Sequence, residues 1–216
     1  MTAYTRRRNW VLWSGLLLVI ATLFLAFLLA QLRFRMFLGK PLPVIGTVAN
    51  FTLTNQLGQP VSLTDLRGHV WVADIIFTRC AGPCLKMTQQ MKDLQKKLPD
   101  PNVRLVSLTT DPDYDTPAVL KNYAERHKAE PNRWLFLTGP KSEISNLANN
   151  SFKLSATEKK PEERETPVDL FIHSTLFIVV DKAGVLRGVF ESVGEGIDSE
   201  HARNQILAAV RRLERE

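Results

Sequence analysis

The chain has 216 residues, 44% of them hydrophobic, with 28 basic and 22 acidic residues and two cysteines. This length and composition fit one globular domain with an appendage, and they exclude a wholly disordered chain and a disulfide-rich scaffold. Six of the basic residues precede residue 41, where no acidic residue occurs, so the other 22 balance all 22 acidic residues. The net charge of +6 therefore belongs to the N-terminal segment, and nothing indicates a nucleic-acid-binding surface.

An uncharged run near the N-terminus predicts a membrane anchor. Residues 10–32 are long enough to cross the hydrocarbon core of a bilayer, which requires about 20 apolar residues. Trp10 and Trp13 stand at one end, where aromatic side chains meet the membrane interface. A cleaved signal peptide has a shorter apolar region and ends in a small-x-small site, which Leu28 and Ala30 do not supply. We therefore expect a single-pass anchor that is retained.

The anchor divides the chain into parts. We expect a cytoplasmic tail, the anchor, a linker containing Gly and Pro, and a folded domain, over residues 1–9, 10–32, 33–47 and 48–216. Basic residues on both sides of the anchor leave the charge bias undecided, but the short tail favours a cytoplasmic N-terminus. The tail is also too short for a mitochondrial transit peptide. We therefore expect a bacterial inner membrane, with the domain on its extracytoplasmic side.

Hydrophobic periodicity predicts alternating strands and helices in the domain. The expected strands are 51–54, 61–62, 70–77, 103–110, 134–137, 176–180 and 185–190, and the expected helices are 83–98, 115–127, 142–151 and 198–214. Thr116, followed by Pro117, and Ser142 are the expected N-caps, and the charged segment 155–167 is expected to be a solvated loop. Early alternation and a late hairpin predict an α/β domain, with a mixed sheet covered by helices on both faces. This order matches a thioredoxin-like fold with an extra central β-α unit.

Cys80 and Cys84 lie between a buried strand and a helix. In a regular helix, cysteines four positions apart are too distant for an unstrained disulfide. Gly82 and Pro83 indicate that the first cysteine lies in the loop and the second in the first helical turn, where the thiols can approach each other. The helix N-terminus stabilises a thiolate, the form that attacks disulfides and binds soft metals. A static disulfide would close too small a loop to add much stability, so a reactive or metal-binding pair is the better hypothesis.

Two further residues are candidates for the same site. Asp74 interrupts an apolar strand six positions before Cys80, and even spacing places both on one face. A buried carboxylate there could accept a proton during thiol exchange; an ordinary hydrogen-bonded acid at a strand end is the alternative. His173 precedes the strand 176–180, and in a thioredoxin-like sheet the loop before this strand faces the redox helix. It is a candidate metal ligand, although most single histidines are not ligands.

Four segments resemble the Sco/SenC family of membrane-anchored, thioredoxin-fold copper proteins. They are FTRCAGPC at 77–84, SLTTDPDYDTPAVLKNYAER at 107–126, WLFLTG at 134–139 and IHSTLFIVVDKAGVLRG at 172–188, in the family's order over about residues 48–212. The combination of CxxxC, DPxxDTP and a late His carries the resemblance. Ala81 and Leu85 stand where many members carry a proline after each cysteine.

The resemblance implies a copper metallochaperone that delivers copper to the binuclear copper site of a haem–copper (cytochrome c) oxidase. It implies Cys80, Cys84 and His173 as the copper ligands, a set of two thiolates and one imidazole that suits Cu(I). The implied partners are the membrane, the copper-bearing subunit of the oxidase and a copper-donor protein. Asp111 and Asp115 match the family's acidic motif, but turn formation and helix capping account for them, and we do not assign them to the site.

Two other functions would use the same cysteines. A thiol–disulfide oxidoreductase would use Cys80 and Cys84 as catalytic residues to keep a partner's cysteines reduced, and it would not need His173. A redox sensor would signal by forming a disulfide between a reactive thiol and a resolving thiol. Copper binding that depends on His173 would separate the metallochaperone from both alternatives.

Overall fold

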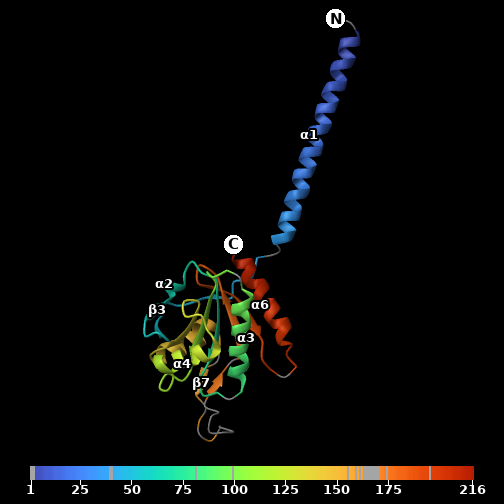
Figure 1. Cartoon of the computed structure of the whole chain (residues 1–216). Helices are drawn as coiled ribbons and strands as arrows, with labels where there is room; N and C mark the ends of the chain where they lie inside the picture. The colour runs from blue at the N-terminus through green and yellow to red at the C-terminus, as the bar shows by residue number, and fades with distance from the viewer. Residues whose placement is uncertain are drawn as a thin grey trace. The chain divides into compact units, whose positions relative to one another are not determined.

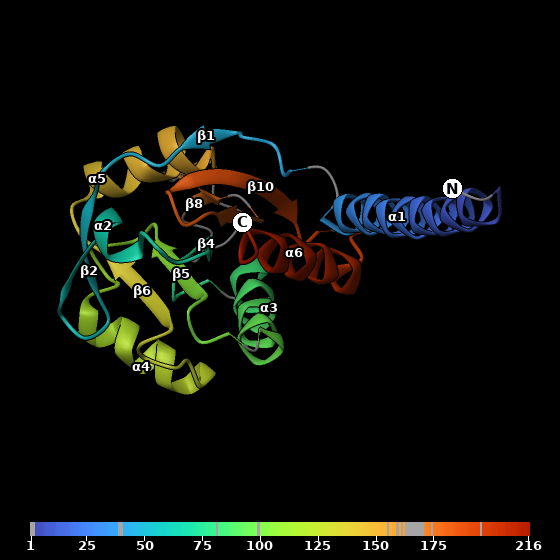
Figure 2. The same cartoon turned by 90° about the horizontal axis from the view of Figure 1, so that it is seen from above.

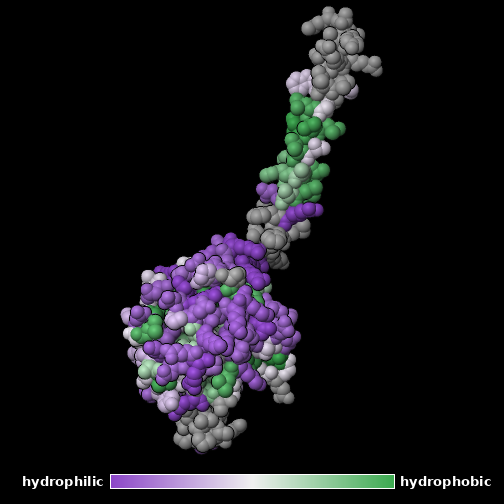
Figure 3. Space-filling model, viewed as in Figure 1, coloured by the Kyte–Doolittle hydropathy of each residue, from purple (hydrophilic) through white to green (hydrophobic). Residues whose placement is uncertain are grey.

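The computed structural model describes residues 3–38, 41–80, 82–98, 100–154, 156–158, 160, 162, 171–173, 175–194 and 196–216. The chain forms two compact units, Met1–Pro41 and Leu42–Glu216. The first unit is one long helix, α1 (Ala3–Leu38), drawn in blue in Figure 1. Its segment Gly15–Arg33 has a mean hydropathy of 2.5 and is long and apolar enough to cross a membrane. Figure 3 shows the apolar surface of this segment, which fits the expected anchor.

An eight-stranded sheet lies at the centre of the second unit (Figure 1). In spatial order its strands are β1 (Gly46–Thr47), β10 (Val185–Glu191), β9 (Leu176–Val180), β4 (Trp71–Ile76), β5 (Arg104–Thr109), β6 (Trp134–Thr138), β2 (Thr52–Asn55) and β3 (Pro60–Ser62). The pairs β4–β5 and β5–β6 are parallel, and the other neighbours are antiparallel. The sheet is therefore mixed, as the sequence predicts. Strand β1 falls within residues 33–47 and pairs with β10.

Helices cover both faces of the sheet, and Figure 2 separates α5 on one side from α3 and α4 on the other. One apolar core lies between the sheet and the helices α3 (Pro83–Lys97), α4 (Pro117–His127) and α6 (Ser199–Leu213). A second core packs under α2 (Leu63–Leu66), α5 (Lys141–Asn146) and the π-helical turn η1 (Leu147–Phe152). Every residue of β4 is buried, and its side chains alternate between the two cores. The predicted α/β architecture is confirmed.

Local chemistry accounts for the helix starts. The Thr116 side chain accepts a hydrogen bond from a backbone N–H of α4, and Pro117 occupies the first helical position, as predicted. The expected cap at Ser142 is wrong, because α5 already begins at Lys141. Pro140 precedes it, and its ring fixes a φ that is compatible with a helix start.

Most of the charged segment 155–167 lies outside the described residues. The described part includes β7 (Ala156–Glu158), which pairs antiparallel with β8 (Phe171–His173) in a separate two-stranded sheet. This pair lies at the lower end of the domain in Figure 1.

Candidate functional site

The loop after β4 carries Cys80 to the start of α3. Gly82 is the N-cap of this helix, Pro83 is its first residue and Cys84 its second. The backbone N–H of Cys80 donates to the carbonyl of Phe77 at 3.2 Å, which closes a turn after the strand. The predicted positions, one cysteine in the loop and one in the first helical turn, are confirmed. Both residues are buried, with 8% of Cys80 and 0% of Cys84 exposed.

The two thiols are reduced and lie in contact. No disulfide joins them, and their side chains share a hydrogen bond. This hydrogen bond and burial raise the pKa of the Cys84 thiol above its ordinary value, and the charge of Asp74 acts in the same direction. The direction of this pKa shift is opposite to the one expected from the position of Cys84 at a helix N-terminus. This thiol must lose a proton before it binds a metal or attacks a disulfide.

Asp74 is a buried carboxylate in the core that contains the two thiols. It lies in the interior of β4 on the same face as Val72 and Ile76, so it is not an acid at a strand end. The Ser107 hydroxyl donates to Asp74 Oδ1 at 2.6 Å, and the Trp134 indole N–H donates to Ser107 Oγ at 3.0 Å. This chain of hydrogen bonds holds the carboxylate in a fixed orientation in the core.

Asp115 anchors the backbone of the cysteine loop. Its carboxylate accepts hydrogen bonds from the backbone N–H of Thr78 at 3.1 Å, from the Thr78 hydroxyl and from the Thr109 hydroxyl at 2.5 Å. Burial raises the pKa of Asp115, while the hydrogen bonds from Thr109 and Thr78 act in the opposite direction. The residue therefore joins the loop after β5 to the loop after β4, and Thr116 is the cap of α4.

Arg79, which directly precedes Cys80, makes a second connection between these loops. Its Nε–H donates to Asp111 Oδ2 at 3.0 Å, and an Nη2–H donates to the same oxygen at 2.5 Å. The guanidinium also lies over the Tyr114 ring, 4.3 Å from the ring centre. The acidic segment 111–115 thus holds the cysteine loop through the two residues that precede Cys80, Thr78 and Arg79.

His173 lies at the end of β8, where its backbone pairs with Ala156. Its side chain lies outside the described residues, so its role as a ligand stays a prediction. The position of the next strand is described: β9 begins at Leu176 and runs antiparallel to β4, with Ile178 opposite Ala73. Strand β9 therefore begins at the end of the sheet where β4 ends. Among the side chains that the structure describes, no three of His, Cys, Asp and Glu form a metal-binding group.

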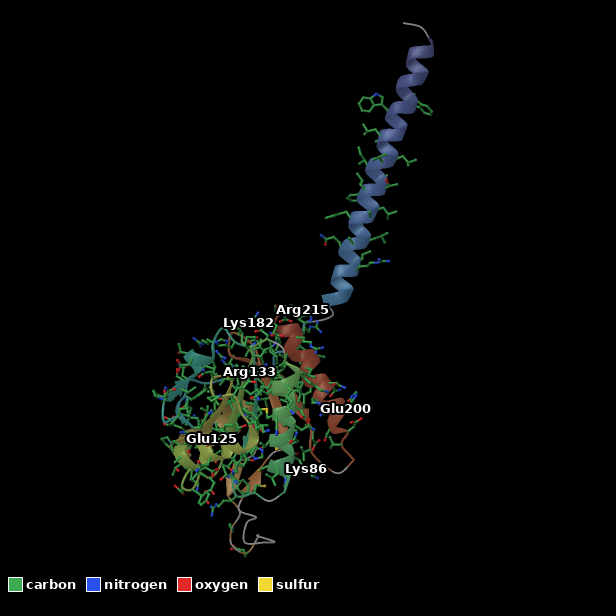
Figure 4. All side chains as sticks on the ribbon, viewed as in Figure 1. Lys86, Glu125, Arg133, Lys182, Glu200 and Arg215 are labelled. Carbon is green, nitrogen blue, oxygen red and sulfur yellow. The ribbon has the colours of Figure 1, made fainter. Side chains whose placement is uncertain are left out.

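Figures 1 and 4 show at which end of the domain α3 begins and the β7–β8 pair lies. Lys86, labelled in Figure 4, marks the beginning of α3 and lies toward the lower end of the domain, the end that carries β7 in Figure 1. Lys182 lies at the opposite end. The start of α3 and the β7–β8 pair therefore occupy the same end of the domain.

Sequence reasoning missed Thr78 and Arg79 and left Asp111 and Asp115 outside the site. The available signal was positional, because DPDYDTP directly follows one predicted strand and Thr-Arg-Cys directly follows the strand before it. Neighbouring parallel strands end at the same edge of a sheet, so the loops that follow them are brought together.

The chain is similar to proteins of one family. A family model described as SCO1/SenC matches residues 43–211. The SCO1 protein homolog of Bacillus subtilis (strain 168) is 44% identical over 145 residues, which cover 66% of this chain and 72% of the relative.

Solved structures agree with this match. BsSco, in which a disulfide switch has been identified and which is a member of the Sco family of cytochrome c oxidase assembly proteins, is 35% identical, with a TM-score of 0.63 over 79% of this chain and 98% of that one. ScoI of Bradyrhizobium japonicum, solved with copper bound, is 21% identical and shares the fold, with a TM-score of 0.63 over 77% of this chain and 99% of that one. The expected thioredoxin-like fold is confirmed. Since the family model covers most of the folded domain, the chain belongs to the SCO1/SenC family.

Proposed function

We propose that this protein is a membrane-anchored copper metallochaperone. It binds copper as cargo through Cys80, Cys84 and His173 and delivers the ion to the binuclear copper site of a haem–copper oxidase. The anchor holds it in a bacterial inner membrane, with the domain on the extracytoplasmic side. Its partners are a copper donor and the copper-bearing subunit of the oxidase. Family membership supports this proposal, as does the oxidase-assembly role of BsSco.

The pair of reduced thiols at the start of α3 carries the proposal. Their side chains are in hydrogen-bond contact, so a single ion replacing the shared proton would meet both sulfurs. Soft thiolate ligands favour Cu(I), and an imidazole completes a low-coordinate site. Zn²⁺ prefers four ligands and would need another donor. Three ligands also leave room for a sulfur of the donor or acceptor protein to enter during transfer.

The position of His173 supports it as the third ligand. Strand β9, which follows β8 in the chain, begins at the end of the sheet where β4 ends and the cysteine loop starts. The resemblance to the family points to the same residue.

Copper titration of the reduced domain without residues 1–40 tests this function. We expect the wild-type domain to bind copper stoichiometrically, followed by absorption and by the spin resonance of Cu(II). The variants Cys80→Ser, Cys84→Ser and His173→Ala should each lose this binding, because each removes one of three ligands. The matched control is His201→Ala, an exposed histidine in the first turn of α6, which should bind like wild type. Full copper retention in His173→Ala would refute the three-ligand site.

The buried carboxylate Asp74 favours a second candidate function, a thiol–disulfide oxidoreductase. Asp74 is buried on the face of β4 that packs into the core with both thiols, which is where an acceptor of thiol protons is needed. An oxidoreductase requires Cys80 and Cys84 but not His173. Equilibration of the pair with a glutathione buffer measures its reduction potential. A pair too reducing to exchange with extracytoplasmic partners rules out this candidate, whereas normal exchange by His173→Ala with loss of copper binding shows that both activities coexist.

A further inference from the structure

Both cysteines of the pair are buried residues. Only 8% of Cys80 and none of Cys84 is exposed. A copper donor, an oxidase subunit or a disulfide must nevertheless reach these atoms directly, since metal and thiol exchange require contact between sulfur and the incoming ligand. Access to the two cysteines is therefore restricted in this conformation of the loop that carries Cys80.

Two side-chain anchors hold this loop, and they differ in exposure. In the Thr78–Asp115 anchor, Thr78 is half-buried and Asp115 is 0% exposed. The Arg79 anchor lies at the surface: 40% of the Arg79 side chain and 46% of Tyr114 are exposed, while the Asp111 side chain is 8% exposed. Solvent and a docking protein can reach the second anchor without disturbing the first.

The contacts of Arg79 with Asp111 and Tyr114 are also of a kind that breaks readily. Two N–H groups of Arg79 donate to one oxygen of Asp111, so the ion pair is not the bidentate arrangement that makes the strongest arginine–carboxylate contacts. A partly exposed ion pair is weakened by water and by salt. The stacking on Tyr114 is likewise half in solvent.

We propose that Arg79 is a positioning residue that latches the cysteine loop over the two thiols. While it binds Asp111 and Tyr114, Cys80 and Cys84 stay covered; when it releases them, the loop opens and the sulfurs become accessible. This inference rests on the proposed function, which identifies copper and its protein partners as what reaches the thiols when the loop opens. The latch itself concerns thiol access and is measurable without copper.

Thiol alkylation rates test the latch. The full-length reduced protein in detergent is treated with iodoacetamide, a small reagent, and with a maleimide that carries a polyethylene glycol chain. We expect Arg79→Met to raise the rate with the bulky reagent by about fivefold, the effect of losing a partly exposed charge-assisted contact, and the rate with the small reagent by less. Tyr114→Ala should act in the same direction, and Arg79→Lys, which keeps the charge but not the planar contacts, should lie between wild type and Arg79→Met.

The charge of Arg79 makes the result diagnostic. Loss of a cation beside Cys80 would by itself favour the neutral thiol and slow both reagents by the same factor. Opening of the loop has the opposite sign and depends on reagent size. Added salt should accelerate the wild type, whose ion pair it screens, but not Arg79→Met.

Arg212→Met is the matched control, since Arg212 pairs with Glu216 at the end of α6. It should alkylate like wild type. The latch is overturned if Arg79→Met leaves both rates unchanged or slows them equally, or if Arg212→Met accelerates alkylation as much. Because no copper is present, loss of the copper-binding proposal would not alter these rates, and failure of the latch would not alter copper binding by the three ligands.

Discussion

Asp115 illustrates how single buried charges organise this protein. The residue is fully buried, yet it is surrounded by donors from two loops that are far apart in the chain. A buried carboxylate is tolerated only where such donors replace water. Asp113, two positions earlier, is exposed, and it does not join two segments of the chain in this way among the described contacts. The environment therefore gives two aspartates of one motif different roles.

We expect Asp115→Ala to lower the free energy of unfolding by about 1–3 kcal/mol, because it leaves the half-buried Thr78 N–H and the buried Thr109 hydroxyl without their acceptor. Asp115→Asn keeps one acceptor oxygen and should lose less. Urea denaturation measures both, with Asp113→Ala as the exposed control. An Ala variant as stable as wild type would show that Asp115 does not hold the loop.

A carboxyl pair at the other end of the domain predicts a pH effect. Burial and the Asp100 carboxyl raise the pKa of Glu214 above its ordinary 4.5, whereas the pKa of Asp100 is lowered, chiefly by the Asn102 backbone N–H at 2.7 Å. Glu214 therefore holds its proton more tightly in the folded protein than in an unfolded chain. Its stabilising contribution is complete below pH 4.5 and is lost as pH rises through the folded-state pKa.

The variant Glu214→Gln stays neutral at every pH and can still donate to Asp100. Its stability relative to wild type should therefore increase as pH rises from about 4 to neutrality. Urea midpoints over a pH series measure this difference. A difference that does not change with pH would show that Glu214 is not the protonated partner.

At the scale of elements, the caps of α4 and α6 differ in quality. Thr116 accepts one backbone hydrogen bond, from Val119 at 3.4 Å. Asp198 accepts two, from Glu200 at 2.9 Å and His201 at 3.0 Å. The backbone N–H groups of His201 and Glu200 lower the pKa of Asp198, so its stabilising contribution is present above the ordinary value of 3.8 and is lost as pH falls.

Asp198→Ala should lower Tm at neutral pH more than Thr116→Ala does, because it removes two well-formed hydrogen bonds and a negative charge at a helix N-terminus. The effect of Asp198→Ala should shrink in acid, while Asp198→Asn should keep most of the stability. Thermal unfolding by circular dichroism at two pH values measures this, and equal losses at both values would contradict the charge contribution.

The junction of β6 with β2 depends on close packing at Gly139. A Cβ at this position would lie 2.7 Å from Leu53 Cδ2, and Leu53 is 1% exposed. Gly139→Ala should therefore lower the free energy of unfolding by about 1–3 kcal/mol through overpacking. Gly46→Ala, with nothing within 4 Å, is the control that should change little. A fully stable Gly139→Ala variant would mean that Leu53 repacks at no cost.

For the whole molecule, the division into two compact units separates anchoring from folding. The buried core residues that the structure describes run from Val48 to Leu213, all within the second unit. The candidate span in α1 is 0% buried, so its apolar surface is available to lipid. The domain therefore carries its own core.

Removal of residues 1–41 should abolish membrane association and leave the Tm of the domain unchanged. Flotation with vesicles measures the first property and thermal unfolding the second, with the full-length protein as the reference. A truncated domain that still floats would place a membrane-binding surface outside α1, and a large drop in Tm would mean that the N-terminal unit stabilises the fold.

The sequence by itself determined the order of the longer strands and helices, the apolar segment and the places of Cys80 and Cys84, but it did not predict the short elements β1, α2, β7 and β8. The predicted features depend on periodicity, on caps such as Thr116 and on the Gly-Pro step before α3, all of which act over a few neighbouring residues. The π-helical turn η1 and the start of α5 were missed, because their boundaries depend on packing as well as on local preference.

Only the tertiary structure decided how the site is held and protected. The contacts Thr78–Asp115 and Arg79–Asp111 join residues 37 and 32 positions apart, and no local pattern specifies them. The raised pKa of Cys84 likewise reverses the expectation from its helix position, because burial and the Cys80 thiol act through space. The burial of Cys84 and the contacts between the two loops arise only when the sheet packs, because its parallel strands bring the loops together at one end.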